Sequence, residues 1–338
     1  MMDRPIKIKP LWHIMIFVML GCGSRTPDVN ENMQVSAKWS EIPQKMKDVD
    51  ACYIAYIDSS GNIAEYSKGV DVGGEPVDQN TLFEGASLSK TFFAYAFWKA
   101  LNTGDIKPAD VHASICGSVS GTIPVSPFKF LSHTVPCSDS CIFPEFKTRN
   151  EFAYSENGYL VLQKAFERHM GMDLEQIATN YIFKPSLLKQ ASFVWQHTNT
   201  NFVDGYYQTG KIHRPIYKLT KPASNGSLYI SGRDLVTFTN MLINSRELDS
   251  MSVPVIPVKG FDHLYWGRGI GIEKNHGREI AWQWGSNWSF NHILLINRSD
   301  RSALICLSNS IIGAKRIRET TKWLLGTDFQ LFDYINWY

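Results

Sequence analysis

Residues 83–92 read Phe83-Glu84-Gly85-Ala86-Ser87-Leu88-Ser89-Lys90-Thr91-Phe92, and they are the most informative segment of the 338-residue chain. Ser87 and Lys90 stand three residues apart at the start of a predicted helix over 87–101, so both lie on one helical face. A serine hydroxyl is a weak nucleophile until a neighbouring base or cation activates it. The lysine amine supplies such a group within one turn, which predicts a nucleophilic serine.

The Ser-x-x-Lys spacing is weak evidence by itself, because the chain contains it twice more, at Ser126/Lys129 and Ser186/Lys189. In both places a proline lies directly beside the serine, and neither serine follows a small-residue turn such as Gly85-Ala86. The prediction therefore depends on what surrounds residues 83–92.

Strand-like patterns lie at both ends of the chain, and helical patterns lie between them. This order predicts an α+β fold, with an antiparallel β-sheet built from the N- and C-terminal segments and flanked by helices. We expect one domain over 38–330, with a mainly helical inserted subdomain over about 106–250. The expected strands are 52–58, 63–66, 267–273, 279–284, 289–297 and 302–309, and the expected helices are 39–47, 87–101, 156–170, 173–183, 232–244 and 312–325.

The first residues have the pattern of an export signal. Lys7 and Lys9 precede an apolar run over 11–20, which is too short for a membrane span of about 20 residues. Cys22 directly follows Gly21, which resembles the cleavage and lipidation site of a bacterial lipoprotein. We expect a signal peptide over 1–21, a lipidated Cys22, a tether over 22–37, and a membrane-anchored protein that faces the periplasm or the cell exterior. Plain secretion and an uncleaved anchor are the alternatives.

The charge balance excludes a nucleic-acid partner. The whole chain has a formal net charge of +2, and residues 1–21 alone supply +2 through Arg4, Lys7 and Lys9 against Asp3. The mature protein is then close to neutral and has no basic field for a polyanion. The expected partners are a small-molecule ester or peptide substrate and, through the lipid, a membrane.

The other cysteines fall into two groups. Cys52 and Cys306 sit in apolar strand-like runs and are expected to be buried. Cys116, Cys137 and Cys141 lie in an irregular region, where export permits a disulfide between Cys137 and Cys141 or one that includes Cys116.

A metal site is not expected. His133 with Cys137 and Cys141 has a loose metal-ligand spacing, but Pro136 breaks any helix that would align them. No other part of the sequence implies a metal or an organic cofactor.

Several ordered motifs resemble one enzyme superfamily. Residues 80–92 resemble the nucleophile segment of the serine β-lactamase and penicillin-binding superfamily, in its class C β-lactamase and esterase branch, which carries Ser-x-x-Lys. The similarity extends over about 38–325. The other segments that resemble family motifs are 130–134, 152–159, 205–206, 221–224, 265–273 and 282–287.

The resemblance implies three catalytic residues, Ser87, Lys90 and Tyr154. Ser87 would attack a carbonyl group and form an acyl-enzyme, while Lys90 would keep the site positive and accept or relay the proton. Tyr154 would be the general base as a phenolate, which requires Lys90 and the helix N-terminus to lower its pKa from about 10. The backbone N–H groups of Ser87 and Ser286 would form the oxyanion hole.

The family resemblance also implies a set of substrate-binding positions, and two of them depart from the family pattern. Where the family has an amide side chain this chain has Glu156, and an ionised carboxylate cannot donate a hydrogen bond. Where the family has Lys or His it has the neutral Gln283. Both changes weaken binding of an anionic β-lactam, unless Arg268 supplies the cation. The expected substrate-binding residues are Glu156, Asn157, Gln283, Trp284 and Gly285.

Two further expectations concern rings near this site. His133 is expected to be a structural residue. Trp282 and Trp284 lie two apart on one predicted strand, and we expect one to face the core and the other to face the cleft.

These features together predict a serine hydrolase that acts on a small ester or amide. Esterase, D-amino-acid peptidase and weak β-lactamase activities all fit. The alternatives are a non-catalytic, lipid-anchored binding protein that keeps the fold, and a penicillin-binding DD-peptidase with slow deacylation.

Overall fold

The computed structural model describes residues 35–111, 125–135, 150–207, 212–275 and 277–335. The predicted signal peptide, Cys22 and the cysteines Cys116, Cys137 and Cys141 lie outside the described residues. In the described part of the chain, no helix is long and apolar enough to cross a bilayer.

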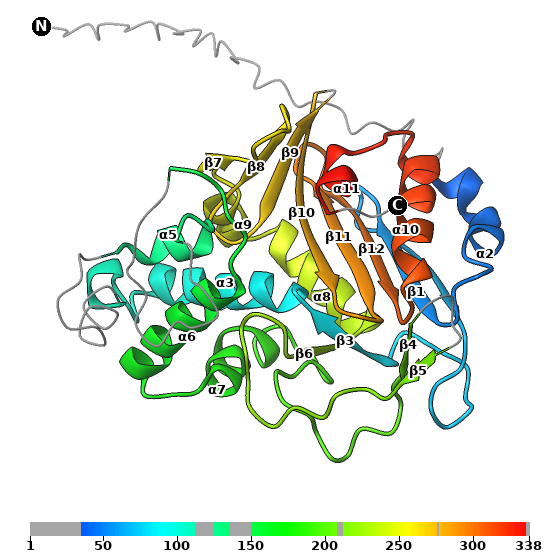
Figure 1. The fold of residues 1–338 in the computed structure, drawn as a ribbon, viewed down its shortest axis with the longest axis horizontal. Coiled ribbons are helices and arrows are strands. Elements are labelled where there is room, and N and C mark those ends of the chain that lie inside the picture. Colours follow the sequence, from blue (N-terminus) through cyan, green and yellow to red (C-terminus); the bar gives the residue numbers. More distant parts are fainter. Residues whose placement is uncertain (1–34, 112–124, 136–149, 208–211, 276, 336–338) are drawn as a thin grey trace, which may run out of the picture.

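An antiparallel sheet of eight strands forms the centre of the described molecule (Figure 1). The N-terminal hairpin pairs with the last strand of the chain, so both termini contribute to the sheet, as predicted. The strand order is β2 (Ile63–Lys68), β1 (Cys52–Ile57), β12 (Ser302–Ser308), β11 (Asn291–Asn297), β10 (Arg278–Ser286), β9 (Gly271–Asn275), β8 (Leu264–Trp266) and β7 (Ile256–Pro257).

Both faces of the sheet are covered, because every residue of β1, β11 and β12 is buried. Alternate residues of a strand point to opposite faces. Tyr53 and Ile305 accordingly belong to the core on the side of the inserted helices, whereas Ile54 and Cys306 belong to the core beneath the C-terminal helix. Cys52 and Cys306 are buried free thiols, as expected.

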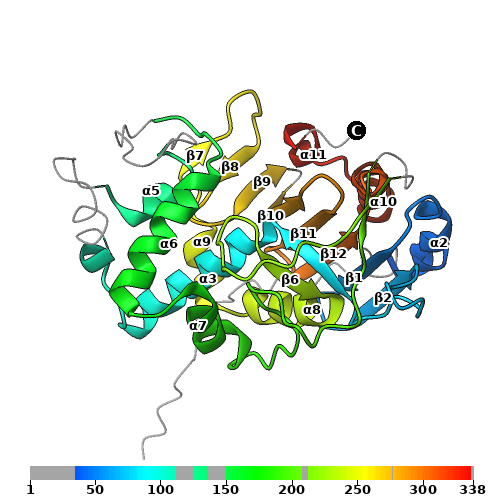
Figure 2. The ribbon, with the colours of Figure 1, turned by 60° about the horizontal axis from the view of Figure 1, so that its bottom comes forward.

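Helices form a layer on each side of the sheet (Figures 1 and 2). One layer contains α10 (Ile312–Leu325), α11 (Gln330–Tyr334), α2 (Ile42–Lys45) and the short 3₁₀ helix η1 (Trp39–Glu41). The other layer contains α3 (Leu88–Thr103), α8 (Gly232–Ile243) and α9 (Arg246–Met251).

A mainly helical part extends from the second layer (Figure 2). Its described elements are α5 (Pro127–Leu131), α6 (Glu156–Met170), α7 (Leu174–Ala178) and the π-helical turn η2 (Thr179–Phe183). The short hairpin β4 (Gly205–Tyr207) and β5 (Ile212–Arg214) lies apart from these helices, below β1 in Figure 1, and the Tyr206 N–H donates to the Asn309 carbonyl at 2.8 Å. A separate pair of strands, β3 (Leu82–Ala86) and β6 (Leu228–Ser231), leads into α3 and α8. The predicted α+β architecture is therefore confirmed.

One expected strand was wrong in its bounds. The predicted strand over 267–273 is interrupted by a turn, in which the Gly267 N–H donates to the Ile270 carbonyl at 2.9 Å. At Gly269, φ is +122°, and a Cβ there would lie 2.3 Å from the Ala94 Cβ, so the turn needs glycine. Residues 35–38, at the end of the predicted tether, are helical, and Val35 is buried.

Candidate active site

The predicted nucleophile lies at a tight turn from β3 into α3. Ala86, just before Ser87, has φ of +45°, a conformation that is uncommon for a residue with a side chain. Ser89 secures this turn, because its hydroxyl donates to the Ala86 carbonyl at 2.6 Å and accepts from the Leu228 N–H at 3.0 Å. The strained turn holds Ser87 at the N-terminal end of α3.

Lys90 contacts Ser87 as the one-turn spacing predicted. Its Nζ donates to the Ser87 Oγ at 2.9 Å and to the Asn225 carbonyl at 2.7 Å, and it lies 4.0 Å from Glu156 Oε1. The side chain is completely buried. Burial lowers the pKa of Lys90 to about 7, although the Glu156 carboxylate acts in the opposite direction. Near neutral pH a large fraction of Lys90 is an uncharged amine that can accept a proton.

Tyr154 adjoins this pair, but its ionisation differs from the expectation. Its ring is partly exposed, while its hydroxyl oxygen is buried close to the Ser87 side chain without the geometry of a formed hydrogen bond. Burial raises the pKa of Tyr154 well above 10, although Ser87 opposes that shift. The lowered pKa that a phenolate base requires is not found, because burial is the largest cause of the shift and the charge on Glu156 adds to it. Lys90 Nζ lies 4.9 Å from the centroid of the Tyr154 ring.

The imidazole ring of His133 packs against the ring of Tyr154. The two rings stack with centroids 4.4 Å apart, and His133 Nδ1 accepts from the Ser155 N–H at 2.9 Å. Burial lowers the pKa of His133 well below its ordinary value, and the charge on Lys90 adds to that effect. The neutral imidazole therefore orients the segment that carries Tyr154, in agreement with the structural role expected for it.

The end of β10 lies against the nucleophile turn. A Cβ on Gly285 would lie 2.4 Å from the Gly85 carbonyl oxygen, so only glycine permits this approach of the two backbones. His292 joins the same strands, with its Nε2 2.7 Å from the Glu84 carbonyl. This approach brings Ser286 and Ser87 to one pocket, where their backbone N–H groups are the candidates for an oxyanion hole.

The other predicted substrate-binding residues of β10 lie behind the pocket. Gln283 is fully buried, and its Nε2 donates to the Ser87 carbonyl at 3.1 Å and the Trp284 carbonyl at 2.9 Å. The expectation that Trp282 and Trp284 face opposite ways was wrong. Residues two apart on a strand share a face. Both rings lie in the core cluster under α10, with centroids 5.7 Å apart, and Trp284 packs 4.8 Å from Tyr154.

Arg268 does not supply the missing cation. Its guanidinium lies 5.0 Å from the centroid of the Phe128 ring, and its carbonyl accepts from the Trp98 indole N–H at 3.0 Å. Neither Arg268 nor Asn157 is among the residues that line the pocket at Ser87. In the described part of the chain, no group of three or more His, Cys, Asp or Glu residues is arranged to hold a metal ion.

The pocket at Ser87 has a volume of about 280 Å³. One of its walls contains a buried ion pair between Glu84 and Arg214, which the sequence analysis did not predict. Glu84 of β3 accepts two hydrogen bonds from the Arg214 guanidinium, at 2.7 and 3.1 Å. It also accepts from the Tyr217 N–H at 2.5 Å and from Asn287 Nδ2 at 2.7 Å.

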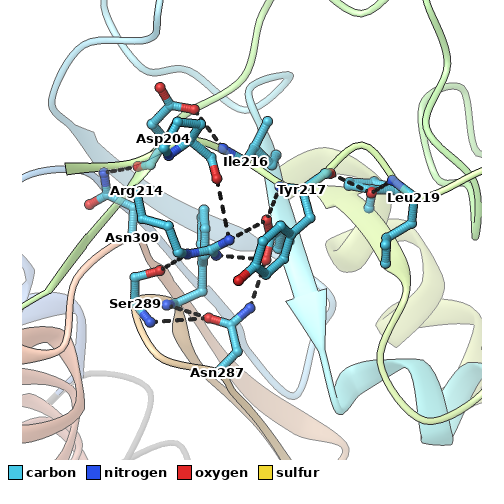
Figure 3. Close-up of polar contacts among 12 residues, drawn as sticks. Asp204, Arg214, Ile216, Tyr217, Leu219, Asn287, Ser289 and Asn309 are labelled. Atoms are coloured by element: carbon cyan, nitrogen blue, oxygen red, sulfur yellow. Dashed lines mark hydrogen bonds and ion pairs between the residues drawn. The ribbon is translucent and has the colours of Figure 1, made fainter.

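Figure 3 shows how this network joins separate segments of the chain. Arg214 Nε donates to the Ser289 hydroxyl at 2.6 Å, and Asn287 Oδ1 accepts from the Ser289 N–H at 3.2 Å. Since Glu84 and Arg214 are separated by 130 residues, no local pattern indicates their pairing. The network fixes Tyr217 and Asn287 in the pocket wall.

Comparison with known proteins identifies the family of the chain. The β-lactamase family profile, described as "Beta-lactamase", matches residues 44–324. The chain belongs to the β-lactamase family of serine hydrolases, which confirms the resemblance identified from the motifs. A search of curated proteins gave no match to the sequence.

Solved structures share the fold. The structure described as "Crystal structure of SurE" is 21% identical, with a TM-score of 0.74, and the match covers 88% of this chain and 77% of that chain. A β-lactamase/D-alanine carboxypeptidase from Pseudomonas syringae is 16% identical (TM-score 0.72, covering 88% and 99%). A class C β-lactamase from Rhodobacter sphaeroides is 14% identical (TM-score 0.71, covering 90% and 99%). At these identities the similarity establishes the fold.

Proposed function

We propose that the protein is a hydrolase that forms an acyl-enzyme on Ser87, with Lys90 as the proton acceptor and a small ester or amide as the substrate. The observation that carries this proposal is the 2.9 Å hydrogen bond between Lys90 Nζ and Ser87 Oγ, made by a buried lysine whose pKa is about 7. A lysine that is half neutral at working pH is matched to general-base catalysis.

The reaction follows from that pair. Neutral Lys90 takes the Ser87 proton as Oγ bonds to the carbonyl carbon, and the negative charge moves to the carbonyl oxygen. The N–H groups of Ser87 and Ser286 would stabilise that oxyanion, each by about 3–4 kcal/mol. The bond to the leaving group then breaks, and the Lys90 ammonium returns its proton to that group. Water attacks the acyl-enzyme in the same way and releases the acid.

Tyr154 has a different role in this proposal. Because burial keeps the phenol protonated, it can donate a hydrogen bond to the leaving group or to Ser87, but it does not start as the base. In this proposal Lys90 accepts the proton, which is one of the two roles expected for it, and Tyr154 is no longer the base.

The charge of the pocket supports an ester or amide without a negative charge over an anionic β-lactam. None of the described residues that line it is Lys, Arg or His. Gln283, which replaces the family cation, is buried and bonded to backbone carbonyls. Among the described residues at this pocket, an acid substrate would find no counter-charge except the partly neutral Lys90.

Hydrolysis of p-nitrophenyl acetate and butyrate by the purified protein and by Ser87→Ala tests this proposal. We expect turnover by the wild type and loss of at least a thousandfold in the variant. Ester turnover that survives in Ser87→Ala, or no turnover at all, would contradict the proposal, and the latter result would favour a binding protein. If the protein is instead exposed to a penicillin and keeps a penicilloyl adduct without turnover, that result would identify a slow-deacylating peptidase.

We also propose that the protein is exported and anchored through lipidated Cys22. The support is the basic, apolar and small-residue pattern over residues 1–22. Incorporation of labelled palmitate into the protein in a bacterial host should be lost in Cys22→Ala. Equal labelling of both forms would refute the anchor.

A further inference from the structure

One carboxylate at the pocket has no strong partner. Glu156 begins α6, lines the pocket at Ser87, and its side chain is 59% exposed. Its ion-pair partner is Lys90, at 4.0 Å. Because the pKa of Lys90 is lowered to about 7, that lysine is partly uncharged at neutral pH, and the negative charge of Glu156 is then only partly balanced.

Aromatic and apolar side chains surround the same pocket. Trp288, Tyr217 and Leu219 all line it, although they are 75%, 50% and 42% exposed. The Arg214 guanidinium already lies 4.3 Å from the centroid of the Tyr217 ring. Trp288 therefore provides the most exposed aromatic face at the pocket, and an indole face attracts cations.

The position of Glu156 also limits where a partner group can be. Glu156 Oε1 and Ser87 Oγ are 4.0 and 2.9 Å from the same Lys90 Nζ. The carboxylate is therefore within reach of a group attached one or two atoms from a carbonyl that Ser87 attacks. A positively charged group at that place would balance Glu156.

We propose that Glu156 selects substrates that carry an ammonium group next to the scissile carbonyl, so that amino-acid esters and amides with a free amine are preferred. Trp288 at the pocket rim favours the same charge. This inference rests on the proposed function, because it names the substrate class of the same site.

Three ethyl esters of nearly equal size test the proposal with wild-type protein and with Glu156→Gln. Alanine ethyl ester carries the ammonium group, ethyl isobutyrate has a methyl group in its place, and monoethyl methylmalonate has a carboxylate. Both enantiomers of the alanine ester are used, and rates are measured at pH 7 by titration of the released acid. Hydrolysis of the neutral ester measures any effect that the substitution of Glu156 has through Lys90. Because that effect is the same for all three esters, it cancels in the ratios of their kcat/KM values.

In Glu156→Gln we expect the ratio of kcat/KM for alanine ethyl ester to kcat/KM for ethyl isobutyrate to fall about tenfold. The ratio of kcat/KM for the methylmalonate ester to kcat/KM for ethyl isobutyrate should rise. Glu151→Gln is the matched control, since Glu151 is exposed, lies in the same segment and does not line the pocket. Its ratios should equal those of the wild type.

Three results would overturn the inference. The first is an equal change for all three esters in Glu156→Gln, which would mean that Glu156 acts only through Lys90. The second is the same change of ratio in Glu151→Gln, which would indicate a general charge effect. The third is no turnover of any ester by protein that a fluorophosphonate still labels at Ser87, which would remove this substrate class and leave the nucleophile in place. Absence of both turnover and labelling would refute the proposed function as well.

Discussion

Replacement of Arg214 by methionine should destabilise the protein more than any exposed charge change. Methionine has a similar length and no charge, so Arg214→Met leaves the Glu84 carboxylate buried without its cation. Both side chains of this pair are more than nine-tenths buried. The substitution removes the two hydrogen bonds from the guanidinium to Glu84 and the one to Ser289.

The expected loss of stability depends on the hydrogen bonds that Glu84 keeps after the substitution. Breaking a buried ion pair from one side costs about 3–5 kcal/mol. Glu84 keeps the bonds from the Tyr217 N–H and Asn287 Nδ2, so we expect a loss near the lower end, about 3 kcal/mol. For a domain of roughly 300 residues, with an unfolding entropy of about 2.1 cal/mol/K per residue, that corresponds to a fall in Tm of about 5 °C. The double variant Glu84→Gln/Arg214→Met should regain part of the loss, because it no longer buries an unpaired charge.

Thermal unfolding followed by circular dichroism measures both variants. Lys315→Met is the matched control, because Lys315 and Glu319 form an exposed pair with side chains 57% and 44% exposed. Its expected effect is at most about 0.5 kcal/mol. If Arg214→Met is no less stable than Lys315→Met, or if the double variant is less stable than Arg214→Met, the reasoning about the buried pair is wrong.

Three further predictions concern the reaction. The rate of Ser87 acylation by a neutral ester should rise with pH through a midpoint near the Lys90 pKa of about 7, because only the uncharged amine accepts a proton, and a rate that is flat between pH 5 and 9 would contradict this. Tyr154→Phe should slow acylation but keep the same midpoint in the pH–rate profile; loss of that midpoint would return the role of base to the tyrosine. Gly285→Ala should lower kcat about a hundredfold, which is the effect of losing one oxyanion donor. The reason is that the new Cβ would lie 2.4 Å from the Gly85 carbonyl oxygen and push Ser286 away. Unchanged steady-state kinetics would show that β10 does not position the oxyanion hole.

Some elements were predictable because the sequence itself carries their signals. The structure ends α6 and α10 where the sequence predicted, over 156–170 and 312–325. Ser155 caps α6 and Gly171 ends it with a left-handed residue, both of which are readable from residue type. The Ser87–Lys90 contact was predictable for the same reason, since it depends on one turn of helix.

Other features depend on tertiary structure that no local pattern reveals. β3 is five residues long and fully buried, so it shows no alternation and merges with the apolar helix that follows. The direction of the pKa shifts of Lys90 and Tyr154 could not be read from the sequence, because burial is the largest cause of both shifts and burial is set by the packing of α3, α6 and β10. The Glu84–Arg214 pair depends on contact between segments that are distant in sequence.

The most direct test of the central claim is the intact mass of the protein after exposure to a fluorophosphonate probe, followed by peptide mapping. The account predicts one adduct, located on Ser87, that is absent in Ser87→Ala and strongly reduced in Lys90→Met. No adduct under conditions in which a β-lactamase-family esterase is fully labelled, or an adduct on another residue, would contradict a Lys90-activated serine nucleophile.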